Sequence, residues 1–251
     1  MLTQTAPSAM HTDSAQSTTA PVVDTAIEAV PLASHFDSAQ QQHDAVTLGM
    51  WLFLATEVMF FGGAFTVYTL YRMNFGEGFH LASKTLDVFV GTINTFVLLT
   101  SSLTMVLAVD ASEKGKRGLT IAYIIATIVF GGAFLGIKAT EYQHKFHEHH
   151  APLHALGYDF QWHPEGVSEE VAQATKGGAE LFFGLYFGMT GLHALHMVIG
   201  MVILGIFIVR CFIARDVRAR SQGLELMGLY WHFVDIVWIF LFPLLYLIDR
   251  T

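Results

Sequence analysis

Five long apolar stretches dominate the chain after residue 45, and each is long enough to cross a lipid bilayer. They run over Val46–Tyr71, Leu86–Val109, Leu119–Ala139, Ala179–Arg210 and Leu226–Ile248. A membrane-spanning α-helix needs about 20 mostly apolar residues, whereas a spanning strand is half as long and alternates apolar with polar positions. The pattern therefore predicts an all-α integral membrane bundle of five transmembrane helices. The fourth stretch is long enough to tilt or to project beyond the bilayer.

The residues before the first stretch have a different composition. Residues 1–44 are rich in Ser, Thr, Ala, Gln and Asp and contain no Lys or Arg. They hold no apolar run that could form a core, and they lack the cationic start and apolar stretch of a secretory signal. We expect 1–44 to be a disordered cytoplasmic tail and 45–251 to form the membrane domain.

Positive charge is concentrated in two of the connections between the stretches. The cations are Lys114, Lys116 and Arg117 in the second connection, and Arg215, Arg218 and Arg220 in the fourth. Connections rich in Lys and Arg stay on the cytoplasmic side of a membrane. The distribution therefore predicts that the N-terminus lies inside and the C-terminus outside.

The overall composition supports a membrane protein and argues against a nucleic-acid partner. The chain is 53% hydrophobic and 14% charged, with a net charge of -8, whereas soluble domains are about 25% charged. No basic stripe is present that could track a phosphate backbone. Cys211 is the single cysteine, which excludes an internal disulfide and a thiolate metal cage.

Ionisable residues inside the apolar stretches are the first candidates for function. Glu57 lies near the middle of the first stretch, where an ionisable group costs about 2.5–3.5 kcal/mol on insertion scales. An unpaired carboxyl group at that depth is expected to be protonated. It can serve as a proton-accessible or partner-binding acid, or simply fix packing through a hydrogen bond. Asn94, Ser101 and Ser102 share one broad face of the second stretch and are candidate packing residues and partners for Glu57.

The last two stretches carry a second group of such residues. His193 and His196 are three positions apart and are expected on one side of their helix. Glu225, His232 and Asp235 share a face of the last helix by the same argument. His232 and Asp235 can satisfy each other or face the two histidines in one buried network. Two histidines without a third ligand do not favour a metal site.

The end of the third stretch and the connection after it are also polar. Lys138 and Glu141 are three positions apart and are expected to form an ion pair at the membrane interface. The connection is rich in histidine between residues 144 and 163, and we expect it to be solvated, with a metal site as the alternative. A membrane di-iron hydroxylase or desaturase is a third hypothesis. Its histidine motifs, or boxes, would be His147-x-His149-His150 and His193-x-x-His196. The predicted topology argues against it, because one box lies outside and the other within the bilayer.

Five sequence runs, one in each stretch, form a more specific set. They read GMWLFLATEVMFF at 49–61, NTFVLLTSS at 94–102, KATEY at 138–142, TGLHALHMVIG at 190–200, and Glu225 followed by YWHFVDIVWIFL at 230–241. Together and in this order, from about residue 45 to the end, they resemble subunit III of the haem-copper respiratory oxidases.

The resemblance implies a non-catalytic subunit of a proton-translocating terminal oxidase in a bacterial cytoplasmic membrane. It implies that the chain carries no cofactor, that haems and copper lie in partner subunits, and that phospholipids are bound. The implied partners are catalytic subunit I and subunit II. A larger respiratory supercomplex is a further candidate partner. By position in the motifs, the lipid-linked or proton-linked residues are Glu57, His193, His196, Glu225, His232 and Asp235, and the structural polar residues are Asn94, Ser101 and Glu141.

The chain departs from the long form of that family, which has seven helices. It resembles the five-helix form, in which the first two helices are absent, as in bacterial quinol oxidases and several bacterial cytochrome oxidases. Homologues associated with nitric oxide reductases share the five-helix form and provide the alternative function.

Overall fold

The computed structural model describes Ser34 and residues 36–148, 160–164, 166–213, 217 and 220–248. Its long helices are α2 (Ala39–Asn74), α4 (Val88–Glu113), α5 (Arg117–His147), α6 (Glu169–Ile213) and α7 (Ser221–Phe242), joined by the short α3 (Gly76–Lys84) and a π-helical turn, η3 (Pro243–Leu247). Five of these segments are long and apolar enough to cross a membrane. The predicted all-helical membrane bundle is confirmed.

Several helices extend beyond the predicted apolar stretches, most clearly α2, α5 and α6. Helix α5 continues past Ala139 to His147, so the start of the histidine-rich connection is helical. Helix α2 begins at Ala39, inside the segment assigned to the tail, where the Ser38 side chain accepts a hydrogen bond from the Gln41 amide at 3.2 Å. Residues 1–33 of that segment lie outside the described residues. Helix α6 has 45 residues and is therefore about 67 Å long, roughly twice the thickness of a bilayer's hydrocarbon core. Its first turns project past the membrane.

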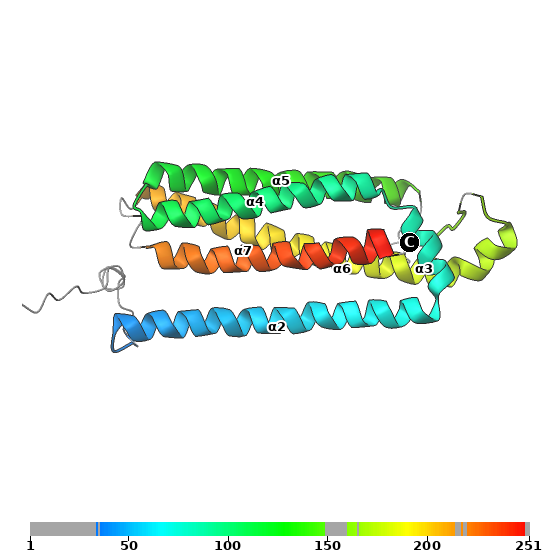
Figure 1. Cartoon of the computed structure of the whole chain (residues 1–251), viewed down its shortest axis with the longest axis horizontal. Helices are drawn as coiled ribbons and strands as arrows, with labels where there is room; N and C mark the ends of the chain where they lie inside the picture. The colour runs from blue at the N-terminus through cyan, green and yellow to red at the C-terminus, as the bar shows by residue number, and fades with distance from the viewer. Residues whose placement is uncertain are drawn as a thin grey trace, which may run out of the picture.

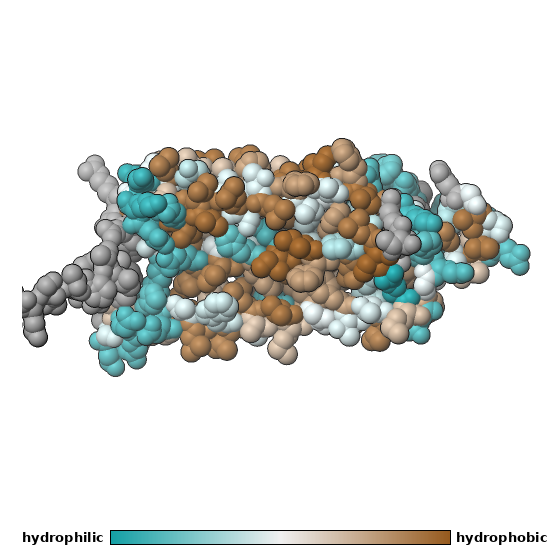
Figure 2. Space-filling model, in the orientation of Figure 1, coloured by the Kyte–Doolittle hydropathy of each residue, from teal (hydrophilic) through white to brown (hydrophobic). Residues whose placement is uncertain are grey.

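The helices lie side by side along one axis, with α2 on one flank and α4 and α5 on the other (Figure 1). Helix α2 packs on α6 and α7, and α4 packs on α5 and α7. The surface is apolar along the middle of the bundle and polar at both ends (Figure 2). This is the distribution that a lipid bilayer requires, because lipid covers the apolar band and water covers the ends.

Trp231 of α7 is the packing centre of the flank formed by α4, α5 and α6. Its side chain is fully buried, and its indole N–H donates to Ser101 Oγ on α4 at 3.1 Å. A Cβ added at Gly131 of α5 would lie 3.1 Å from the indole ring, and one at Gly200 of α6 would lie 3.0 Å from it. The two glycines therefore form the slot that lets four helices meet around one ring.

A second pair of glycines sets the crossing of α3 and α6. A Cβ added at Gly78 would lie 2.7 Å from the Gly178 Cα, so the two backbones touch. This contact holds α3 across the projecting part of α6.

We predict that Gly200→Leu destabilises the bundle by about 1 to 3 kcal/mol, because the new side chain must displace the Trp231 ring. Gly205→Leu on the same helix is the matched control, since a Cβ there meets no atom within 4 Å. Thermal unfolding of the purified chain in detergent measures both effects. Equal unfolding temperatures for the two variants would contradict the slot.

Candidate functional site

Helix α2 faces its neighbours with a stripe of side chains that includes Glu57. Leu54, Phe61 and Tyr68 are buried at intervals of seven residues, and Glu57 lies on the same face, one turn after Leu54. Glu57 Oε2 is 3.1 Å from Nε2 of His196 on α6, and the two side chains are 19% and 13% exposed. The carboxyl group therefore has a partner across the helix interface.

The hydrogen bonds of His196 define what this pair can do. Its Nδ1 is 2.9 Å from the Leu192 carbonyl oxygen, and a carbonyl only accepts, so the network assigns a proton to Nδ1. Nε2 then either accepts a hydrogen bond from a protonated Glu57 or donates one to its carboxylate. Both arrangements hold one proton between the two groups and carry no net charge. The pair can therefore hold or pass a proton within the bilayer.

Side chains of α2 and α7 pack around the pair. The Phe61 ring lies 5.5 Å from the His196 ring, edge to face. Tyr230 of α7 donates its hydroxyl proton to the His196 carbonyl oxygen at 3.0 Å. The Glu57–His196 site is thus built by α2, α6 and α7 together.

The polar residues of α4 contact other helices, which corrects their assignment as partners of Glu57. Ser101 donates to the Thr127 carbonyl oxygen on α5 at 3.2 Å and also accepts the Trp231 N–H. Ser102 Oγ is 2.7 Å from His232 Nδ1. Asn94 is fully buried, and its amide atoms have no hydrogen-bond partner among the described residues.

The two histidines of α6 contact different helices, although their spacing of three predicted that both lie on one side of α6. His196 turns to α2, whereas His193 is buried between the Phe134 ring at 5.4 Å and the Trp238 ring at 5.3 Å. A spacing of three rotates a side chain by about 60° around the helix, enough to reach a different neighbour in a crowded bundle. One network joining His193, His196 and Asp235 is therefore not formed.

Two polar residues of α7 face the same position on α4. His232 is hydrogen-bonded to Ser102, and Asp235 lies toward that hydroxyl rather than being bonded to His232. Asp235 is 3% exposed, and both carboxyl oxygens lack a hydrogen-bond partner in the part of the chain that is described. Glu225 is exposed in the first turns of the helix, where its side chain meets Glu113 at the end of α4.

Metal coordination finds no support in the described part of the chain. Within it, no group of three His, Cys, Asp or Glu side chains is placed to hold an ion. The di-iron hypothesis requires the side chains of His193 and His196 to converge, but they point to different neighbouring helices. His149, His150 and His154 of the histidine-rich connection lie outside the described residues.

The Lys138–Glu141 ion pair is confirmed at 3.1 Å, but it is buried rather than interfacial, with side chains 7% and 9% exposed. Lys138 Nζ also donates to the hydroxyls of Tyr186 at 3.1 Å and Tyr246 at 2.8 Å. Tyr186 donates in turn to Glu141 Oε1 at 2.6 Å. Every proton of the ammonium is used, which is what a buried charged network needs to be stable.

Sequence reasoning missed the tyrosines of this cluster. Tyr186 belongs to α6 and Tyr246 to η3, so neither is near Lys138 along the chain. The available signal was weak: Tyr186, Thr190 and His193 follow a helical spacing of four and three, which places them on one face. That spacing does not identify the helix opposite.

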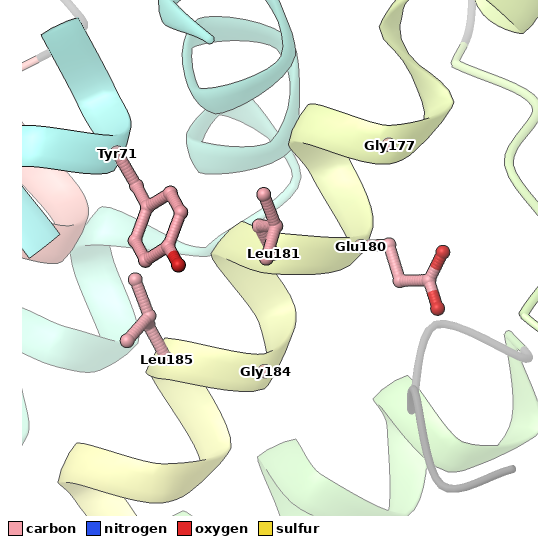
Figure 3. A pocket seen from close by; sticks show the side chains of 6 residues that line it. All are labelled: Tyr71, Gly177, Glu180, Leu181, Gly184 and Leu185. Carbon is pink, nitrogen blue, oxygen red and sulfur yellow. The ribbon is translucent and has the colours of Figure 1, made fainter. Parts of the chain in front are cut away.

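A groove of about 500 Å³ opens at the end of α2, on the surface of α6. It is lined by Tyr71, Gly177, Glu180, Leu181, Gly184 and Leu185. Tyr71 points over Leu181 and Leu185, while Glu180 extends to the other side of α6 (Figure 3). The groove is mainly apolar with a hydroxyl at its rim.

These features define a multi-pass helical membrane protein with a hydrogen-bonded Glu–His pair between two of its spans. A family model described as "Cytochrome c oxidase subunit III" matches residues 165–249, which include α6 and α7. The chain is 31% identical over 226 residues to "Cytochrome c oxidase subunit 3" of Thermostichus vulcanus, covering 89% of this chain and 98% of that protein.

Two further relatives broaden the comparison. "Probable quinol oxidase subunit 3" of Staphylococcus epidermidis is 27% identical over 227 residues, covering 87% of this chain and 96% of the relative. "Heme-copper oxidase subunit I+III" of Aeropyrum pernix is 28% identical over 212 residues, covering 82% of this chain and 23% of that longer protein. The chain belongs to the subunit III family of haem-copper respiratory oxidases, which confirms the resemblance seen in the motifs.

We predict that Glu141→Gln strongly destabilises the protein, by about 3 to 5 kcal/mol, because it leaves the Lys138 ammonium buried without a counter-charge. The double variant Lys138→Met with Glu141→Gln removes that charge and should cost less than the sum of the single variants. A double-mutant cycle on unfolding temperature in detergent measures the coupling. Additive effects would show that the two groups do not act as a pair.

Proposed function

We propose that this chain is the non-catalytic subunit III of a haem-copper terminal oxidase, which transfers electrons to O2 in aerobic respiration. The observation that carries the proposal is the match over nearly the full length of a curated cytochrome c oxidase subunit 3. The nitric oxide reductase alternative is less favoured, since the relatives described above are named as oxidase subunits. The proposed location is the bacterial cytoplasmic membrane.

Catalytic subunit I is the proposed direct partner. In the Aeropyrum pernix relative, the names of subunits I and III are joined in one chain, which favours an arrangement in which the two pack together. Haems and copper belong to the partner subunits in this proposal. Subunit II and a larger respiratory supercomplex are further proposed partners.

Bound phospholipid is a second proposed feature. The groove beside Tyr71 is apolar along Leu181 and Leu185, as an acyl chain requires. It lies toward the end of α2, where a lipid headgroup could reach the Tyr71 hydroxyl.

Within the oxidase, we assign Glu57 and His196 a role in proton uptake or in stability during turnover. The pair holds one proton without net charge, so a proton can move between the groups without leaving a charge in the bilayer. This property distinguishes the pair from the Lys138 cluster, whose hydrogen bonds are saturated.

Two substitutions separate the proton role from packing. Glu57→Gln keeps a hydrogen bond to His196 Nε2 but removes the exchangeable proton, whereas Glu57→Leu removes both. We predict that Glu57→Gln lowers proton pumping or shortens the turnover lifetime of the complete oxidase, with Glu57→Leu at least as severe. Oxygen consumption and proton release in reconstituted vesicles measure both quantities.

Glu169→Gln, an exposed carboxyl in the first turn of α6, is the control and should behave as wild type. A normal Glu57→Gln oxidase alongside an impaired Glu57→Leu oxidase would assign Glu57 to packing alone.

The proposed orientation places the α4–α5 turn in the cytoplasm and α3 outside. In a Cys211→Ala background, we predict that Lys114→Cys in intact cells resists a membrane-impermeant thiol reagent, whereas Glu77→Cys reacts. Both native side chains are exposed, so reactivity reports the side of the membrane. Inverted vesicles should reverse the result, and the opposite pattern in cells would refute the orientation.

A further inference from the structure

Three fully buried side chains carry polar atoms without a hydrogen-bond partner among the described residues. They are Asn94 at 0% exposure, His193 at 1% and Asp235 at 3%. Native proteins hold few such atoms, because an unpaired polar group in an apolar interior is costly. Asp235 faces the Ser102 hydroxyl. Asn94 and His193 therefore call most clearly for a partner that the described side chains do not supply.

His193 borders a pair of aromatic rings that is bonded to α4 at the residue next to Asn94. The His193 ring lies against both Phe134 and Trp238, and those two rings touch edge to face at 4.8 Å. The Trp238 indole N–H donates to Thr95, the residue after Asn94, at 3.0 Å.

The pairing of α4 with α5 gives the same placement. Ser101 contacts Thr127 across that antiparallel pair, so the residues seven positions away on each helix, Asn94 and Phe134, lie at one level. Asn94 of α4 and His193 of α6 therefore approach the Phe134–Trp238 pair from two helices.

Neighbouring polar side chains are already occupied. Lys138 uses its three protons on Glu141, Tyr186 and Tyr246. Thr95 accepts the Trp238 N–H and donates to the Gly91 carbonyl oxygen at 2.9 Å. No hydroxyl or ammonium proton of these groups remains for His193.

We propose that Asn94 and His193 bind ordered water inside the bundle, next to the Phe134–Trp238 pair. A neutral imidazole needs one donor and one acceptor, and an amide offers both. Water supplies both functions, and buried waters make about three hydrogen bonds each. The hydrated site would connect α4 to α6 where they have no direct polar contact through these residues. The inference does not depend on the proposed oxidase function.

The direct test is a cryo-EM map of the full chain in its native membrane complex, at a resolution where other buried waters are visible. We expect a density peak about 2.7–3.2 Å from a ring nitrogen of His193 or from the Asn94 amide. No peak at the site, or direct contact between the two side chains, would overturn the proposal.

A stability measurement gives an independent answer. Asn94→Leu removes a ligand of the water and should lower the unfolding temperature of the complex, because His193 and the water lose a partner. In a dry site the same change removes an unsatisfied amide and should raise that temperature. Asn74→Leu, at an exposed position near the end of α2, is the control and should shift it little. If Asn94→Leu fails to assemble, the wild-type map alone decides.

Discussion

A hydrogen-bonding side chain inside a bilayer cannot turn to bulk water, and this constraint organises the whole bundle. Each polar residue of the spans must meet a partner on another helix, on its own backbone or in a water molecule held inside the bundle. The helices are therefore held in register by where those partners lie, as well as by packing. Ser101 shows this directly, since one hydroxyl links α4 to the α5 backbone and to the Trp231 indole of α7.

The same constraint gives the two charged sites different properties. Around Lys138, each ammonium proton and both Glu141 oxygens are bound, so the cluster resists change. Glu57 and His196 have fewer hydrogen-bond partners than the Lys138 cluster, and they are slightly more exposed. One proton serves both groups, and it has two places to reside. The Lys138 cluster and the Glu57–His196 pair therefore use the same kinds of chemical group. They differ in how completely their donors and acceptors are matched.

The spans could be predicted from the sequence because the length of an apolar stretch is a local property, and the thickness of the bilayer sets the length that is required. The start of α6 could not be predicted, since Glu169, Glu170 and Lys176 make its first turns polar. Packing against α3 and a hydrogen bond from the Trp162 indole to Thr175 hold these turns in place. Among the site residues, the Lys138–Glu141 contact followed from spacing on one helix. Contacts between different helices could not be predicted in this way. Spacing gives only the face on which a residue lies, and the arrangement of the helices decides that His196 meets Glu57 while His193 meets Trp238.

Helix α2 is the least buried of the five spans, which makes its few polar contacts important. Tyr68 donates to the Leu244 carbonyl oxygen at 2.9 Å, and about three turns away along the helix Glu57 meets His196. Lipid offers no hydrogen bonds, so breaking either contact would leave an unpaired polar group in the apolar band. The Glu57–His196 contact therefore also helps to position the helix that carries Glu57.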